Sequence, residues 1–203
     1  MPIITSIKPQ KKKDRVNIYL DGKFSFGIDL ENFVLTGLKV EQELSNKEIA
    51  DIVKKAEFQK TLDKLLRFAM VRPRSEKEVD GYFRRKKVHA SLYPALLEKL
   101  KHLNLLNDEE FARWWVEQRQ SFRPKPKRIL NIELRTKGIK KEIIEKVLGE
   151  TKIDEEKMAR ELLNKKMYKW KALPAREACQ KMSQYLAGKG FSWEMIEKVV
   201  SKS

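Results

Sequence analysis

Few side chains in this sequence could carry catalysis or hold a metal ion. The glycines are scattered at turns and form no phosphate-binding loop. His89 and His102 have no cysteine or histidine companions at metal-ligand spacing, so we expect both at the surface. Cys179 shares an apparent apolar face with Met182 and Leu186, which indicates a buried thiol rather than a nucleophile. The sequence therefore predicts no enzyme, with no catalytic residue, no cofactor and no bound metal.

Clustered cations are the stronger chemical signal. Residues 84–87 read Arg-Arg-Lys-Lys at the end of a predicted helix whose buried stripe is Val79, Tyr82 and Phe83. Two cations would suffice to complement the helix dipole, and four exceed that need. A high local positive potential attracts phosphates and carboxylates, so we expect this helix end to bind an anionic partner. The alternative is a solvated helix end.

Two further basic segments lie close by. Arg72 and Arg74 flank Pro73, which holds both on a stiff connector, although either could instead pair with Glu76 or Glu78. The stretch from residue 119 to residue 128 contains no acid. Arg135 is one further candidate. Outside residues 84–87, the candidates for contact with an anionic partner are therefore Arg72, Arg74, Arg119, Arg123, Lys125, Lys127, Arg128 and Arg135.

Aromatic residues near these cations have two readings. Trp114 and Trp115 follow Phe111 at helical spacing, so we expect them in the core, with one indole at its edge. A stacking platform for bases is the second choice for this pair. Trp170 lies among basic residues, where it could contact single-stranded nucleic acid or pack within a loop.

The bulk composition agrees with an anionic partner. The chain has 203 residues and a formal charge of +16, and each quarter carries a net positive charge rather than a single basic tail. One cysteine permits no intramolecular disulfide, and no apolar run is long enough to cross a membrane. We expect a monomeric cytoplasmic protein with no membrane partner.

The elements that position these residues are mostly helical. Residues 3–28 read as strands, with Asp21-Gly22 as a type I′ hairpin turn and a basic loop at 10–15. A helix opens at Ser45 with a capping box to Glu48, ends near residue 56, and covers this small antiparallel sheet. From residue 57 onward we expect helices alone.

Three segments of the helical part repeat. Residues 96–100, 143–147 and 195–199 read LLEKL, IIEKV and MIEKV. Residues 83–88, 134–139 and 186–191 also correspond, so the sequence predicts three tandem three-helix repeats in an elongated, curved body. The predicted division is an N-terminal segment 1–56 and repeats at 57–106, 107–152 and 153–203. The predicted helices are 58–70, 75–87, 92–104, 108–120, 126–137, 140–149, 154–166, 174–187 and 191–202.

Helix ends support this division. Ser75 with Glu78 and Asn107 with Glu110 have capping-box spacing. Gly138 and Gly190 stand where the second helix of a repeat must stop. In the first repeat Lys87 holds the glycine position, so we expect that helix to end differently.

Several motifs resemble those of one family. Residues 72–83, RPRSEKEVDGYF, resemble the R-x-R-S-x-x-E-[LV]-x-x-x-[LF] motif of the RecX family of recombinase regulators. Residues 103–119, LNLLNDEEFARWWVEQR, and 133–139, ELRTKGI, are similar to two more of its blocks. The N-terminal hairpin resembles the extension of longer members.

This resemblance implies three tandem three-helix repeats that bind RecA nucleoprotein filaments, and possible direct contact with single- and double-stranded DNA. It also implies regulation of recombination, DNA repair and the SOS response through the RecA ATPase, strand exchange and coprotease activities. From the residues alone, the alternative is a basic helical-repeat protein that binds DNA without RecA.

Overall fold

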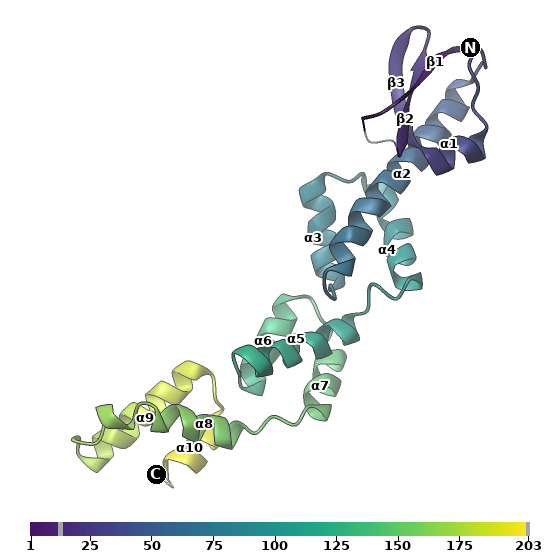
Figure 1. The fold of residues 1–203 in the computed structure, drawn as a ribbon. Helices are drawn as coiled ribbons and strands as arrows, with labels where there is room; N and C mark the ends of the chain where they lie inside the picture. Colours follow the sequence, from purple (N-terminus) through teal and green to yellow (C-terminus); the bar gives the residue numbers. More distant parts are fainter. Residues whose placement is uncertain (12–13, 202–203) are drawn as a thin grey trace. The chain divides into compact units, whose positions relative to one another are not determined.

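The structure is a computed structural model that describes residues 1–11 and 14–201. The chain forms two compact units, one made of residues 1–72 and 85–103 and the other of residues 73–84 and 104 onward. Figure 1 shows the helices and strands along the chain. Lys12 and Lys13 of the predicted basic loop, and Lys202 at the end of the last predicted helix, lie outside the described residues. The predicted division at residues 56, 106 and 152 stays a prediction.

The first unit begins with a three-stranded antiparallel sheet in the order β1 (Ile4–Pro9), β2 (Arg15–Leu20), β3 (Lys23–Asp29). Asp21 and Gly22 join β2 to β3 with φ of 48° and 78°, so both turn residues are left-handed, as a type I′ turn requires. The predicted hairpin is confirmed.

Two helices, α1 (Leu30–Thr36) and α2 (Asn46–Met70), cover this sheet. Asp29 caps α1 by accepting a hydrogen bond from the Asn32 amide at 2.9 Å. Ile4, Ile18 and Ile28 of the sheet are fully buried, in one core with Ile52 and Ala56 of α2. The helix that was predicted to cover the sheet is therefore confirmed.

A single helix, α2, runs through the predicted boundary at residue 56. Its capping box, Ser45 with Glu48, is formed as expected. The predicted break between residues 56 and 58 is wrong, because Glu57-Phe58-Gln59 contains no proline, glycine or cap that would end a helix. The first half of α2 packs on the sheet and the second half contacts α4 (Tyr93–His102), which follows a short 3₁₀ turn, η1 (Ala90–Leu92).

The remaining helices confirm the predicted ranges to within a few residues. Helix α3 (Glu76–Lys86) belongs to the second unit as far as Arg84. The second repeat consists of α5 (Asp108–Phe122), α6 (Lys127–Thr136) and α7 (Lys141–Glu150) around a core that contains Phe111, Leu134 and Ile144. The third consists of α8 (Glu155–Asn164), a 3₁₀ turn η2 (Met167–Lys169), α9 (Ala175–Lys189) and α10 (Trp193–Val200).

Within the second unit, the same joint connects successive repeats. The Asp108 carboxylate, at the start of α5, accepts a hydrogen bond from the Glu76 amide at the start of α3 at 2.9 Å. The Glu155 carboxylate, at the start of α8, likewise accepts from the Lys127 amide at the start of α6 at 2.5 Å. The first helices of the second and third repeats thus each supply an acceptor to an orphan amide of the preceding repeat's second helix.

Two glycines complete this joint. Gly138 and Gly190 follow α6 and α9 with φ of 85° and 90°. A β-carbon at Gly138 would lie 2.7 Å from Cβ of Lys77 on α3, and one at Gly190 would lie 2.3 Å from Cδ1 of Ile129 on α6. Each glycine therefore provides both a left-handed turn and close contact with the preceding repeat.

Helix α3 ends in the same way as its counterparts, so the expectation of a different ending is wrong. Lys87 adopts a φ of 52° at the position of the glycines. Its side chain is exposed, which avoids the close contact that excludes a β-carbon at Gly138 and Gly190. The left-handed conformation costs an L-residue about 1–2 kcal/mol, which a folded domain can tolerate at one position.

Substitution of Lys87 by glycine should relieve this strain. We expect Lys87→Gly to raise the free energy of unfolding by about 0.5–1 kcal/mol, since the flexibility of glycine in the unfolded chain offsets part of the gain. Lys87→Ala removes the same charge but keeps a β-carbon, and should not stabilise the protein. Urea unfolding followed by circular dichroism measures both, and equal stabilities would show that the left-handed residue is unstrained.

The thiol of Cys179 is exposed, so the prediction that it is buried is wrong. Ala178, Met182 and Leu186 follow one another at a spacing of four on the face of α9 that packs against the core. Cys179 lies one residue, or about 100°, away from that face. The thiol thereby turns to solvent.

Candidate interface for an anionic partner

A groove lined by basic side chains lies between α6 and α7 of the second repeat. It has a volume of about 460 Å³, and Lys127, Arg128 and Arg135 of α6 line it. Three of the predicted site residues are therefore brought together. Among the described residues, neither Arg128 nor Arg135 forms an ion pair, and both side chains are exposed, so their charges are open to a partner.

Helical geometry explains this placement. Leu130 and Leu134, four residues apart on α6, are fully buried in the core. Arg128, Ile132 and Arg135 follow at spacings of four and three on another face, so they line up along the groove. Ile132 is 52% exposed, which places an apolar contact between two guanidinium groups. This combination suits a surface that offers carboxylates or phosphates beside apolar groups.

One wall of the groove is acidic. Glu145 of α7 lines it together with Leu148, and the Nζ of Lys141 lies 3.6 Å from a Glu145 oxygen. Lys141 partly neutralises this carboxylate, and the three cations of α6 outnumber it. The groove therefore keeps a net positive charge.

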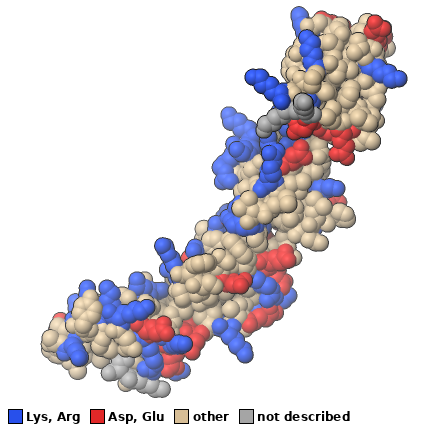
Figure 2. All heavy atoms as spheres, in the orientation of Figure 1, with Lys and Arg blue, Asp and Glu red and all other residues tan. Residues whose placement is uncertain are grey.

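The cluster at residues 84–87 closes α3 with four exposed side chains, as predicted. Arg84 pairs with Asp80, one turn earlier, while its side chain stays 74% exposed. An exposed pair of this kind contributes little to stability and leaves the guanidinium accessible. On the face drawn in Figure 2, Lys and Arg side chains occur over both units and are interspersed with Asp and Glu.

Two predicted site residues are held inside the second unit. The Arg74 guanidinium lies 3.9 Å from Glu78, and both side chains are at most 15% exposed. Glu78 also accepts a hydrogen bond from Nζ of Lys137 at 2.8 Å, which joins α3 to the end of α6. Pairing with Glu78 was one of the two expected uses of Arg74, and this pairing leaves the residue a weaker candidate for partner contact.

Arg119 is engaged in the same way. Its Nε donates to Glu133 at 2.7 Å, and its guanidinium lies 4.4 Å from the centroid of the Trp115 ring. The Trp115 indole N–H donates to the same carboxylate at 2.8 Å, and Nζ of Lys137 lies 4.7 Å from its ring. The half-buried Trp115 ring is thus already in contact with side chains of this protein. These contacts favour a place at the edge of the core over a role in base stacking.

The loop between α5 and α6 holds Arg123, which is exposed, and Lys125, which is half-buried. Phe122, beside Arg123, is 78% exposed and was not among the predicted site residues. Helical spacing places it on the same face as Phe111 and Trp115, so periodicity would assign it to the core. It is exposed because it is the last residue of α5. Arg72, half-buried, lies on the connector after α2.

Trp170 packs within the third repeat. It lies against the core of α8–α10, with its ring centroid 5.6 Å from that of Tyr185. This contact favours the packed-loop reading over the nucleic-acid reading.

An ion triad recurs in the second and third repeats. Glu109 on α5 pairs with Arg113 and with Lys146 of α7, at 2.8 and 2.9 Å. Glu156 on α8 pairs with Arg160 and with Lys198 of α10, at 2.9 and 2.6 Å. Hydrogen bonds from Lys198 and Arg160 lower the pKa of Glu156 to about 2.

Acid should abolish the contribution of this triad. Because the pKa of Glu156 in the folded protein lies below its ordinary value of 4.5, its stabilisation is complete above pH 4.5 and is lost as pH falls towards 2. We expect Glu156→Gln to be less stable than the native protein at pH 7, and the difference to vanish near pH 2. Urea unfolding between pH 7 and pH 2 tests this, and a difference that is constant with pH would contradict it.

Among the described residues, no three His, Cys, Asp or Glu side chains are grouped to hold a metal ion. His89 and His102 are exposed, as expected. None of the described helices combines the length and apolar character needed to cross a membrane. The expectations of a monomer and of a cytoplasmic location stay predictions.

Family models match three parts of the chain. Residues 2–45 match the regulatory protein RecX N-terminal domain, residues 107–148 the second three-helix domain of RecX, and residues 154–200 its third three-helix domain. The last two ranges contain almost all of α5–α7 and all of α8–α10, which supports the predicted repeats there.

Whole-chain comparisons agree with these matches. The regulatory protein RecX of Bacillus pumilus is 36% identical over all of this chain and 78% of its own length. That of Bacillus subtilis is 32% identical over all of this chain and 77% of its own. A crystal structure of a regulatory protein RecX matches over the whole of both chains, with a TM-score of 0.79 and 26% identity. RecX from Lactobacillus salivarius shares the fold over 72% of this chain, with a TM-score of 0.61.

Proposed function

We propose, because this chain belongs to the RecX family of regulatory proteins, that it binds RecA filaments assembled on DNA and regulates recombination, DNA repair and the SOS response. In this proposal it inhibits or otherwise modulates the ATPase, strand exchange and coprotease activities of RecA. The protein acts by binding and performs no chemistry of its own.

The observation that supports this proposal most directly is the groove between α6 and α7. Arg128 and Arg135 are exposed there without ion pairs among the described residues, and Ile132 lies between them. A filament on DNA presents both phosphates and protein carboxylates, and such a groove can bind either.

Hydrolysis of ATP by a bacterial RecA on single-stranded DNA tests the proposal. The purified protein should lower the rate at ratios near or below one per RecA monomer. A rate that stays constant over a wide titration would contradict the proposed function.

A second candidate is direct DNA binding without RecA, which the open cations of the same groove also favour. The logarithm of the affinity for DNA would then fall with the logarithm of salt concentration, by about one unit of slope per phosphate contact. A DNA affinity that does not respond to salt would exclude this candidate.

The cluster at residues 84–87 supplies a separate prediction. Replacing Arg84, Arg85, Lys86 and Lys87 by glutamine should raise the concentration needed for half-inhibition of RecA several-fold and leave helicity unchanged, since all four side chains are exposed. Glutamine at Lys60 and Lys64, both exposed on α2, serves as the control. Unchanged inhibition by the fourfold variant would show that the cluster is a solvated helix end.

A further inference from the structure

A second groove lies in the first unit, between α2 and the segment formed by η1 and α4. One part has a volume of about 610 Å³, and its lining includes Asn32, Lys54 and Leu92. A second part, of about 550 Å³, continues along α4 to His102. Both parts share Phe58 and Ala95, so they adjoin each other, and together they are called the groove below. None of the predicted site residues lines it.

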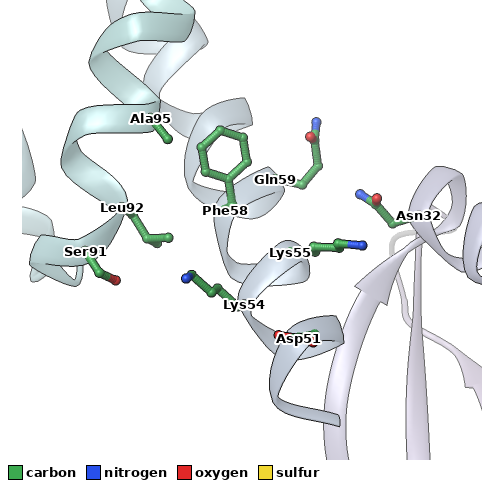
Figure 3. A pocket seen from close by; sticks show the side chains of 9 residues that line it. All are labelled: Asn32, Asp51, Lys54, Lys55, Phe58, Gln59, Ser91, Leu92 and Ala95. Atoms are coloured by element: carbon green, nitrogen blue, oxygen red, sulfur yellow. The ribbon is translucent and has the colours of Figure 1, made fainter. Parts of the chain in front are cut away.

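Its centre is apolar and its edges are basic. Figure 3 shows Phe58 of α2 opposite Leu92 and Ala95, with Lys54 and Lys55 on the α2 side. Phe58 is half-buried and Leu92 is buried, so a small apolar surface remains for a partner side chain.

Exposed lysines line the same groove. Lys54, Lys55 and Lys99 are exposed and form no ion pair among the described residues. The acids in its lining are Asp51 and Glu98. The lysines therefore outnumber the acids, and the groove has a net positive charge that favours an anionic ligand.

A hydrogen-bond acceptor is also available. Nδ2 of Asn32 donates to both carboxylate oxygens of Asp29, at 3.1 and 3.0 Å, which leaves Oδ1 of Asn32 to accept. Backbone N–H groups of an extended peptide are suitable donors for such an oxygen.

We propose that this groove binds an acidic peptide segment of a protein partner, with one apolar side chain of the peptide on Phe58 and its carboxylates on Lys54, Lys55 and Lys99. Cationic edges on either side of an apolar centre complement a peptide that carries acids on both sides of one large apolar residue. The groove would give the N-terminal β segment, through α1 and α2, a role in partner recognition.

Two features favour a peptide over nucleic acid. A nucleic-acid strand carries a phosphate at every nucleotide and would meet the carboxylates of Asp51 and Glu98, whereas a peptide can space its acids to avoid them. Base stacking also requires an open ring face, and Phe58 is half-buried beside Leu92.

Fluorescence anisotropy with a labelled twelve-residue Asp/Glu peptide that carries one central leucine tests the proposal. We expect saturable binding to the full-length protein, weakened at least ten-fold when lysines replace the acids and several-fold when serine replaces the leucine. This test contains no RecA, so its result does not depend on the proposed function. Absence of saturable binding would overturn the inference.

Matched variants locate the site. Lys54→Glu with Lys55→Glu should weaken binding of the acidic peptide at least ten-fold, and Phe58→Ala several-fold. Lys60→Glu with Lys64→Glu, which changes two exposed lysines of the same helix outside the groove, should leave binding unchanged. Circular dichroism verifies that each variant is folded. If Phe58→Ala unfolds, the variant with Lys54→Glu and Lys55→Glu still tests the site.

The same assay compares the peptide with single-stranded DNA, the competing ligand. A labelled twelve-nucleotide oligo-dT should bind more weakly than the peptide and should respond equally to both pairs of lysine substitutions. Tighter oligo-dT binding that is lost only with Lys54 and Lys55 would assign the groove to nucleic acid and overturn the peptide proposal. Equal loss of peptide binding in both pairs would also overturn it, because the attraction would then be a general surface effect.

Discussion

Replacing Phe111 with alanine is expected to lower the free energy of unfolding of the second three-helix repeat by about 3–5 kcal/mol. Phe111 is fully buried in the core shared by α5, α6 and α7, and its ring centroid lies 5.8 Å from that of Trp115. Truncation would remove the transfer free energy of the ring and leave a cavity among side chains such as Leu130 and Ile144.

The same helix contains a matched control. Phe122 is 78% exposed at the end of α5, so Phe122→Ala should change stability by less than about 0.5 kcal/mol. Urea unfolding followed by tryptophan fluorescence compares the two variants, since Trp114 and Trp115 near this core contribute two of the four tryptophans. Similar losses from both would show that the packing around Phe111 is not the source of stability.

The second large effect concerns the groove between α6 and α7. A variant with Lys127→Glu, Arg128→Glu and Arg135→Glu should raise the concentration needed for half-inhibition of RecA ATP hydrolysis by roughly ten-fold or more. Each exposed charge contact contributes about 0.2–1 kcal/mol, and reversal adds repulsion to the loss of attraction. Three such contacts sum to about 0.6–3 kcal/mol before repulsion is added, against the 1.4 kcal/mol that corresponds to a factor of ten.

A control of equal charge belongs in the third repeat. Lys171, Arg176 and Lys181 are exposed, and none of the three lines the groove between α6 and α7. Glutamate at these three positions changes the net charge by the same six units, so it isolates the effect of position. Equal loss of inhibition by both triple variants would mean that net charge, rather than the groove, governs the proposed interaction with RecA.

Secondary structure was predictable because its causes are local. Asp21-Gly22 permits the turn between β2 and β3, Ser45 caps α2, and Gly138 and Gly190 end α6 and α9, each through the preferences of its own residues. The break predicted in α2 rested on the expected start of the first repeat and not on a local signal. No helix-breaking residue lies between Ala56 and Phe58.

The use of several cations depended on contacts between helices that the sequence pattern does not contain. Arg74 and Arg119 looked in the sequence like Arg128 and Arg135. Arg74 pairs with Glu78 only four residues on, which was one of its two expected uses, whereas Arg119 pairs with Glu133 of the next helix, 14 residues away.

The amino-acid sequence by itself determined the helices, the repeat period and the excess of positive charge, because spacing and composition are local properties. Only the tertiary structure decided which charges stay open. It lined Lys127, Arg128 and Arg135 along one groove, paired Arg119 of α5 with Glu133 of α6, and turned Cys179 to solvent. The physical reason is that a side chain's exposure and its ion pairs depend on which helices meet, and that contact is set by packing between residues distant in sequence.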